Sequence, residues 1–338
     1  MEMRRVQIMG VGKYLPRSVV TAEEIDEKLG TRKGWVAKKA GVLTRHFADG
    51  ETASQMGAAA AREALTKAGL SLSDIDCIVC ASGTMEQAIP CTASLIYSEL
   101  DPTHTGIPAF DINSTCLSFV TAFDHLSYLI TAGRYRQILI VSTEIASVGL
   151  DWTQKESSAL FGDGAAAVVL GPTPQGEKSA ILSSRMETYS QGAHLSEIRG
   201  GGTKHHPRKY GAELDMSDFL FDMDGEAIFR LSARYLPEFI KRLLSKDAIG
   251  TPRLSLNEVD LVIPHQASMM AMRLMQRRLG ISKKQMFIFA QNHGNTIASS
   301  IPIGIYEAIE QGQIQRGDTV MLLGTSAGLS LGGLVFVY

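Results

Sequence analysis

The sequence predicts an α/β protein made of two related halves, residues 1–173 and 174–338. The stretch "GLSLSDIDCIVCASGT" (69–84) aligns without gaps with "RLSLNEVDLVIPHQAS" (253–268), and each follows an amphipathic, helix-like stretch. Further on, "YRQILIVSTEIAS" (135–147) is echoed by "GDTVMLLGTSAGL" (317–329). Two pairs of similar segments in the same order indicate a duplicated half rather than an array of short repeats.

Short apolar runs alternate with helix-period stretches within each half, a pattern typical of parallel sheets covered by helices on both faces. The expected strands of the first half are "DCIVCAS" (76–82), "GIPAFDI" (106–112), "QILIVST" (137–143) and "GAAAVVL" (164–170). Those of the second half are "LVIPH" (261–265), "VMLLGT" (320–325) and "GGLVFVY" (332–338). The two halves are expected to join near "LGPTPQGEKS" (170–179), which is rich in glycine, proline and polar residues.

The bulk composition narrows the class of protein. Apolar residues make up 45% of the 338 residues and charged residues 20%, as in a soluble globular protein. A net charge of -2 argues against general binding to nucleic acid or to a membrane surface. No apolar run approaches the roughly 18 residues of a spanning helix, and the glycine-broken start does not read as a signal peptide. The cytoplasm is therefore the expected location.

Three of the four cysteines have a simple interpretation. Cys77, Cys80 and Cys91 are expected to be small buried residues, because "CIVC" lies inside a strand-like run. No second cysteine pair or nearby histidine pair completes a zinc site, so we expect no metal.

Cys116 lies in a different setting, between the strand-like "AFDI" and a long apolar helical stretch. A thiol at a helix N-terminus feels the positive end of the helix dipole, which favours the thiolate. The same backbone can donate to a developing oxyanion. The alternative interpretation is a cysteine used as a small core residue.

Polar groups follow three further strand-like runs. His265 follows "DLVIP", Asn295 lies in "QNHGNTIASS" after "MFIFA" (286–290), and the glycine-rich "GTSAGLSLGG" (324–333) follows "VMLL". Taken singly, these could be a satisfied polar histidine, a helix cap and a tight turn. Ligands collect at the carboxyl ends of strands in open α/β sheets. Together with Cys116, the histidine and asparagine therefore indicate a nucleophile with two polar partners.

These motifs, in this order and spacing, resemble the β-ketoacyl synthase III branch of the thiolase superfamily. The resemblance covers nearly the whole chain and implies a homodimer of thiolase-like, five-layered αβαβα subunits. The matching stretches are "GVGKYLP" at the start, "GWVAKKAGVLTRH" (34–46), "STCLSF", "FGDGAAA" (161–167), "VIPHQAS", "NHGNTIASSIP" and "GTSAGLSLGG".

The resemblance implies a reaction in two steps. Cys116 takes an acyl group from an acyl-CoA primer, and a malonyl thioester on CoA or on acyl carrier protein then loses CO2 and attacks it. His265 and Asn295 match the pair that binds the extender carbonyl. The N–H of Cys116 and a second N–H from the Ala327–Gly328 turn would hold the oxyanion. The setting would be fatty-acid or polyketide-type biosynthesis, and no metal or redox cofactor is required.

The features expected to bind CoA are only partly kept. Trp35 matches the tryptophan that stacks on adenine, but its usual arginine partner aligns near Lys155, which stacks less well. The position five residues after His265, usually basic, is Met270. Arg273 follows on the same helix, and Arg230 precedes it at another expected phosphate-facing position. The alternative interpretation is that both arginines are solvent-exposed surface residues with no ligand.

Ile89 occupies the place where the dimer partner closes the acyl tunnel in this family. Isoleucine frees volume relative to the aromatic residue of short-chain enzymes, so we expect longer straight or branched acyl chains to be accepted. Head-to-head condensing relatives carry a glutamate base at this place; here the nearest carboxyl group is Glu86, three residues upstream.

Two rival hypotheses remain at this stage. One is a related enzyme that moves the acyl group from Cys116 to a hydroxyl or amine, or condenses two acyl-CoAs without decarboxylation. The other is an idle paralogue kept as a binding subunit. Release of CO2 from a malonyl thioester separates the leading hypothesis from the first rival, and acylation of Cys116 separates it from the second.

Overall fold

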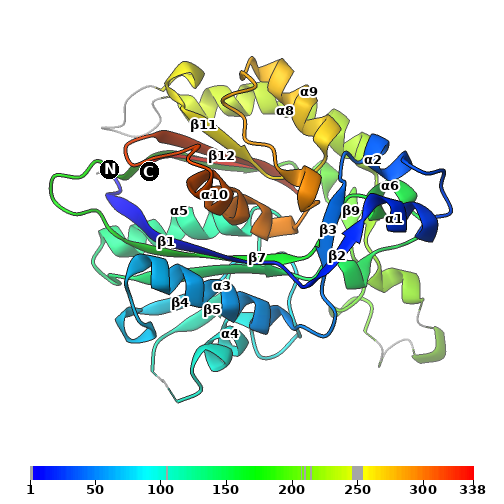
Figure 1. Ribbon diagram of the computed structural model, residues 1–338, viewed down its shortest axis with the longest axis horizontal. Helices are drawn as coiled ribbons and strands as arrows, with labels where there is room; N and C mark the ends of the chain where they lie inside the picture. The colour runs from blue at the N-terminus through cyan, green and yellow to red at the C-terminus, as the bar shows by residue number, and fades with distance from the viewer. Residues whose placement is uncertain (1–2, 104–105, 207, 209–210, 214, 246–253) are drawn as a thin grey trace.

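The computed structural model describes the whole chain except residues 1–2, 104–105, 207, 209–210, 214 and 246–253. Within the described residues, two large sheets lie one above the other with helices between and outside them (Figure 1). The first sheet has the order β1 (Val6–Tyr14), β7 (Gly164–Pro172), β6 (Ile138–Glu144), β4 (Cys77–Cys80) and β5 (Ala109–Asp111). The second has the order β11 (Leu261–Pro264), β12 (Thr319–Ser326), β13 (Ser330–Val337) and β8 (Ala180–Thr188).

Helices complete five layers. Helices α3 (Ala53–Ala68) and α4 (Thr92–Leu100) cover the outer face of the first sheet, and α5 (Ser118–Thr131) and α10 (Ser300–Glu310) lie between the sheets. Helices α8 (Gly225–Leu244) and α9 (Met269–Leu279) cover the outer face of the second sheet. This is the five-layered αβαβα arrangement expected from the sequence.

The strands are not all parallel, which corrects one expectation. Only β4 with β5, β4 with β6, and β11 with β12 pair in parallel; the other pairs within the two large sheets are antiparallel. The reason is clearest at β12 and β13, which are joined by a tight turn, a connection that only antiparallel neighbours allow. Strands β1 and β8, which the sequence pattern did not single out, extend the two sheets.

The seven strands predicted from apolar runs are all present, whereas "MFIFA" (286–290) is not a regular strand. Met286 alone forms a bridge, to Val262. The side chain of Gln266 takes the place of a neighbouring strand, because its Oε1 accepts the N–H groups of Phe289 and Ala290 at 2.9 and 3.0 Å. Buried backbone donors need partners, and here a side chain supplies them.

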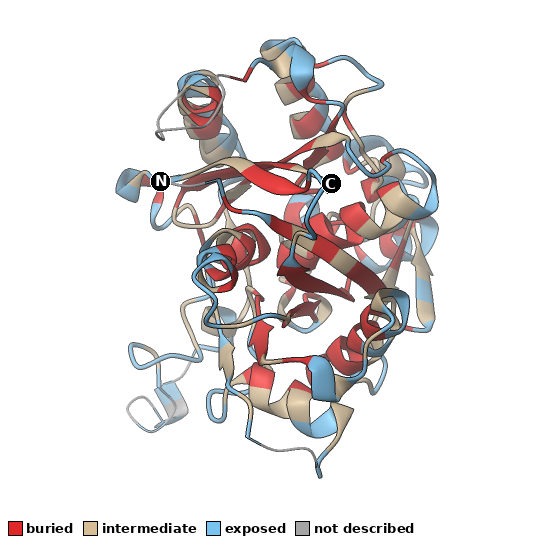
Figure 2. Cartoon of the chain, turned by 90° about the vertical axis from the view of Figure 1, so that its left-hand side faces the viewer, coloured by how far each residue is buried: buried red, intermediate tan, exposed pale blue. Residues whose placement is uncertain are grey.

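Buried residues fill the two sheets, the helices between them and the sheet-facing sides of the outer helices (Figure 2). Helix α5 shows why: Phe119, Phe123 and Leu126 recur at helical spacing and are all buried in the same apolar cluster. All strands of the first sheet precede residue 173 and all strands of the second follow residue 179. The division into halves 1–173 and 174–338 stays a prediction.

A smaller region lies at one end of the two sheets (Figure 1). It contains the hairpin of β2 (Ser18–Thr21) and β3 (Thr44–Phe47), and the helices α1 (Ala22–Lys28), α2 (Trp35–Lys39) and α6 (Lys155–Ser158). Strands β9 (Ser196–Glu197) and β10 (Asp222–Met223) pair nearby. Across the part of the chain that the structure describes, no helix combines the length and apolar character needed to cross a membrane.

Candidate active site

Cys116 lies in a tight turn between β5 and α5. The residue before it, Thr115, has a φ of 51°, in the left-handed region that a β-branched residue rarely adopts. The turn is held by Ser118, whose Oγ lies 2.7 Å from the carbonyl of Thr115 and 2.9 Å from the N–H of Ser114. Such strain persists only where the surroundings fix it, and it is common at functional sites.

The thiol of Cys116 is protonated at neutral pH. Burial raises its pKa to about 12, and the nearby carboxylate of Glu144 adds to the increase. The N–H groups of Cys116 and Ala327 act in the opposite direction, because they donate toward the sulfur. These surroundings therefore favour the protonated thiol over the thiolate expected from a helix N-terminus. In addition, α5 begins at Ser118, two residues after Cys116.

His265 follows β11 directly and is buried, with 4% of its surface exposed. Its Nδ1 lies 2.7 Å from the Oγ of Ser300, the first residue of α10. Burial lowers the pKa of His265 to about 4, so the ring is neutral at physiological pH. The N–H of Gln266 points to the same Oγ at 3.4 Å. With the Ser300 hydroxyl as the donor and Nδ1 as the acceptor, the neutral ring carries its proton on Nε2.

Asn295 lies between two 3₁₀ turns, η7 (Ala290–Asn292) and η8 (Ile297–Ser299), and is 6% exposed. Its backbone is paired with the chain of the first half: its N–H donates to the carbonyl of Leu160 at 2.8 Å, and its carbonyl accepts the N–H of Gly162 at 3.1 Å. Its side-chain Oδ1 accepts the N–H of Ile297 at 2.9 Å. The amide is thereby oriented so that Nδ2 keeps its protons for another acceptor.

Gly324 on β12 brings the nucleophile's turn and His265 together. A Cβ at this position would lie 2.9 Å from the Cβ of His265 and 3.1 Å from a methyl group of Leu117, the residue after Cys116. Only glycine allows both neighbours to approach this closely. Just beyond, Ala327 and Gly328 form the turn between β12 and β13, and the N–H of Ala327 faces the sulfur of Cys116.

The site thus gathers four groups of known chemistry. A thiol faces two backbone N–H groups, as the sequence predicts for an oxyanion site. The neutral imidazole of His265 is bound at Nδ1, and the amide of Asn295 is bound at Oδ1. Their remaining nitrogens, Nε2 and Nδ2, are left as donors. Such an arrangement suits acyl transfer followed by stabilisation of an enolate.

Comparisons with known proteins identify the family. Profiles of 3-oxoacyl-[acyl-carrier-protein (ACP)] synthase III match residues 110–190, and those of its C-terminal part match residues 250–338. The β-ketoacyl-[acyl-carrier-protein] synthase III of Aquifex aeolicus is 33% identical over 98% of this chain and 99% of its own. The chain belongs to the synthase III family.

Further relatives agree with this assignment. The synthase III of Roseobacter denitrificans is 33% identical over 98% of both chains. The crystal structure of 3-oxoacyl-[acyl-carrier-protein] synthase III from Aquifex aeolicus superimposes with a TM-score of 0.86 at 32% identity, covering 98% of this chain and 100% of that one. This synthase is therefore a condensing enzyme of the β-ketoacyl synthase III type, an acyltransferase, and the resemblance seen in the sequence is confirmed.

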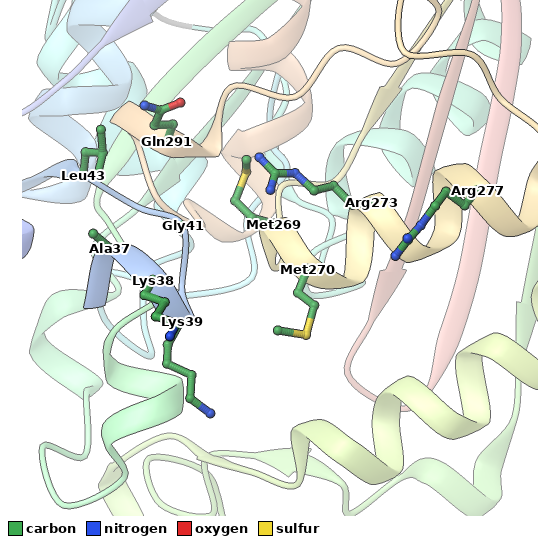
Figure 3. Close-up of a pocket in the computed structure, with 10 residues that line it drawn as sticks. All are labelled: Ala37, Lys38, Lys39, Gly41, Leu43, Met269, Met270, Arg273, Arg277 and Gln291. Atoms are coloured by element: carbon green, nitrogen blue, oxygen red, sulfur yellow. The ribbon is translucent and has the colours of Figure 1, made fainter. Parts of the chain in front are cut away.

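A basic cleft of about 360 Å³ opens between α2 and α9 (Figure 3). Lys38 and Lys39 of α2 line one wall, and Met270, Arg273 and Arg277 of α9 line the other. Four cations around one cleft favour an anionic ligand such as a phosphate group. Met270, which replaces the usual basic residue, is 59% exposed and extends into the cleft.

The remaining residues expected to bind CoA are not all gathered at this cleft. Trp35 begins α2 and Lys155 begins α6; the two helices are joined by an ion pair of 3.2 Å between Lys39 and Glu156. Lys155 makes no cation–ring contact with Trp35 among the interactions of the described residues. Arg230 is exposed on α8 and forms an ion pair of 3.1 Å with Glu226 one turn before it.

Ile89 lies on the surface of the subunit, 85% exposed, in the loop before α4. It is not among the residues that line the basic cleft. Glu86, the other carboxyl group considered at this place, accepts the N–H of Ser54 at 2.6 Å, in the first turn of α3. It is therefore engaged as a helix cap.

Three residues at the site were missed by sequence reasoning: Ser300, Gln266 and Glu144. Ser300 and Gln266 lie within the motifs that carry the histidine and asparagine, but nothing in their spacing shows which atoms they contact. Glu144 ends the apolar strand β6, and a carboxylate inside such a run was the one available signal.

Proposed function

We propose that this synthase condenses an acyl-CoA primer with a malonyl thioester, using Cys116 as the nucleophile and His265 and Asn295 as donors to the extender. The observation that carries the proposal is the orientation of the two donors. Ser300 occupies Nδ1 of His265 and the N–H of Ile297 occupies Oδ1 of Asn295. Both side chains are therefore fixed with N–H groups free for one carbonyl oxygen.

In the first step the sulfur of Cys116 attacks the carbonyl carbon of the acyl-CoA. The carbonyl oxygen becomes an oxyanion, which accepts hydrogen bonds from the N–H groups of Cys116 and Ala327. The C–S bond to CoA then breaks, and the departing CoA thiolate takes the proton that the thiol of Cys116 loses. Because the free thiol is protonated, this proton moves as the new bond forms, and the product is an acyl thioester on Cys116.

In the second step the malonyl thioester binds with its carbonyl oxygen on Nε2–H of His265 and Nδ2–H of Asn295. The bond to its carboxylate breaks, CO2 leaves, and the electron pair forms an enolate that the two neutral donors stabilise without losing a proton. The enolate carbon attacks the acyl carbonyl, and the C–S bond to Cys116 breaks. The Cys116 thiolate takes up a proton from solvent, and a β-ketoacyl thioester leaves.

Two features of the surface support the proposed binding partners. The basic cleft of Lys38, Lys39, Arg273 and Arg277 supports a phosphate-bearing thioester, either CoA or the phosphopantetheine of acyl carrier protein. The exposed Ile89 supports a homodimer in which a second subunit covers this side chain, because burying an exposed isoleucine is favourable. Trp35, Lys155, Arg230 and the tunnel role of Ile89 remain parts of the proposal.

Intact-protein mass spectrometry after mixing with acyl-CoAs from C2 to C12 tests the first step. Wild type should gain the acyl mass and Cys116→Ala should not. Malonyl-CoA or malonyl carrier protein should then discharge the adduct with release of CO2. Acylation without malonyl-dependent CO2 would favour transfer to another nucleophile or a non-decarboxylative condensation. No acylation by any primer would reject the synthase role of this site.

A further inference from the structure

Glu144 has a fully buried carboxyl group that the reaction above does not use. Burial raises the pKa of this group to about 7, while hydrogen bonds from Thr84, Gly83 and Ala298 act in the opposite direction. Glu144 ends β6, and its two oxygens accept four hydrogen bonds: from the N–H of Gly83 at 2.5 Å, from the N–H and Oγ1 of Thr84 at 3.0 and 2.6 Å, and from the N–H of Ala298 at 3.3 Å. No ion pair balances it among the described residues. The carboxylate thus joins two segments, the loop after β4 and the turn η8, that are far apart in the sequence.

Both segments adjoin the reacting groups. A Cβ on Gly83 would lie 2.7 Å from a methyl group of Ile297 and 3.3 Å from the Cα of Thr115. Thr115 directly precedes Cys116, and the N–H of Ile297 orients the amide of Asn295. The loop that Glu144 holds is therefore packed between the turn of the nucleophile and the turn of the extender donor.

Thr115 and Ile297 share an unusual conformation. In the described structure they are the non-glycine residues with positive φ, at 51° and 49°. β-Branched residues avoid this region, and they keep it only where neighbouring contacts hold it. Gly83 touches both, and Glu144 binds Gly83 on one side and Ala298, the residue after Ile297, on the other.

We propose that Glu144 is a positioning residue of the condensing reaction: its carboxylate holds the left-handed turns at Thr115 and Ile297 against Gly83, and so fixes the amide of Asn295 relative to the thiol of Cys116. This inference rests on the proposed function of Cys116 and Asn295. The turn at Thr115 has its own hydrogen bonds with Ser118 and Asn113 and meets Glu144 only through Gly83. In the turn at Ile297, by contrast, the N–H of Ala298 donates directly to Glu144. Loss of the carboxylate should therefore affect condensation more than acylation.

The test compares the two half-reactions in Glu144→Gln and Glu144→Asp. Glutamine keeps the shape but turns an NH2 group toward backbone N–H donors, whereas aspartate keeps the charge. In Glu144→Gln, Cys116 should be acylated within about threefold of the wild-type rate, while CO2 release by the acylated enzyme should fall about 100-fold in kcat with little change in KM for the malonyl thioester. Glu144→Asp should recover part of the loss. Glu63→Gln, a matched change of a partly buried carboxylate away from the site, should retain both activities.

Several results would overturn the inference. One is a folded Glu144→Gln enzyme with wild-type CO2 release; another is an equal loss of both half-reactions, which would indicate only general destabilisation. If Glu144→Gln does not fold, Thr84→Val removes a single donor to the carboxylate and should lower CO2 release about five- to tenfold; an unchanged rate would reject the proposal. Failure of the wild type itself to acylate Cys116 or release CO2 would instead reject the proposed function.

Discussion

The hydroxyl of Ser300 lies 2.7 Å from Nδ1 of His265, within hydrogen-bonding distance of that ring nitrogen. Because Ser300 begins α10 and His265 directly follows β11, the pairing of a helix start with a strand end controls the orientation of a buried neutral ring. The donor role proposed for Nε2 of His265 thus depends on a residue that need not contact the substrate.

Ser300→Ala should remove this control. Without the hydroxyl the ring can rotate or place its proton on Nδ1, and the loss of one buried hydrogen bond corresponds to about tenfold in rate. CO2 release from the malonyl thioester should fall by about that factor, while acylation of Cys116 by acyl-CoA stays unchanged. Ser127→Ala, a buried serine on the far side of α5, is the control. A wild-type rate of CO2 release in Ser300→Ala would show that the tautomer is set by other contacts.

Asn295→Asp should leave the shape of the site intact but remove its amide donor. A carboxylate cannot donate to the enolate oxygen and repels its charge, so condensation should fall about 100- to 1000-fold. The acyl-enzyme should still form, because that step uses backbone N–H groups. Single-turnover assays with pre-acylated enzyme measure the difference, and parallel losses in both steps would contradict the assigned role.

The reactivity of Cys116 toward iodoacetamide should rise with pH across the alkaline range. Its pKa, raised to about 12 by burial and by Glu144, means that the thiolate fraction grows about tenfold per pH unit between pH 7 and 10. Peptide mass spectrometry can follow alkylation at Cys116 alone. A plateau below pH 9 would show that the thiol ionises as an ordinary cysteine does, or more readily.

Arg273→Ala should weaken binding of the CoA thioester. The guanidinium lines the basic cleft, and loss of one charge-assisted contact should raise KM about five- to tenfold with little change in kcat. Arg278→Ala, on the same helix but outside the cleft lining, is the matched control. Arg230→Ala should change KM less than about twofold because its charge is shared with exposed Glu226. An equal effect of all three changes would mean that only net charge matters.

Gly324→Ala tests how the two parts of the site are brought together. The added methyl would meet the Cβ of His265 at 2.9 Å and Leu117 at 3.1 Å, so one of them must move. We expect a loss of about 1–3 kcal/mol in the free energy of unfolding and at least a tenfold loss of condensation. Gly202→Ala, where no atom lies within 4 Å of the new methyl, should change neither. Urea unfolding and CO2 release measure the two effects.

Much of the fold was predictable because it rests on local patterns. The apolar runs that became β4, β6, β7 and β12 are buried along nearly their whole length, so their composition alone marks them. Strand direction was not predictable, because it depends on how distant strands pair. The segment 286–290 looks like a strand in composition, yet its backbone is satisfied by the side chain of Gln266, a contact that no periodicity reveals.

Some residues of the candidate site were also predictable from the sequence, and others were not. Cys116, His265 and Asn295 were expected from motif order, and the structure brings their segments together around Gly324 and Gly83. Ser300 and Glu144 were not expected, because their importance lies in which atoms they contact. The pKa of Cys116 is raised, whereas the sequence predicted a stabilised thiolate. A helix start is visible in the sequence, but the burial of the thiol and, to a lesser extent, the charge of Glu144 are not.

The close packing at Gly324 has a further consequence for how the enzyme responds to heat. Cys116 follows a strand of the first sheet and His265 follows a strand of the second. The relative position of the two residues therefore depends on how the two sheets are packed against each other. A small slip of one sheet on the other would part the reacting groups while every strand kept its neighbours. On heating, we therefore expect activity to fall at a lower temperature than that at which the protein unfolds. Loss of activity would then detect the first change in the packing of the two sheets.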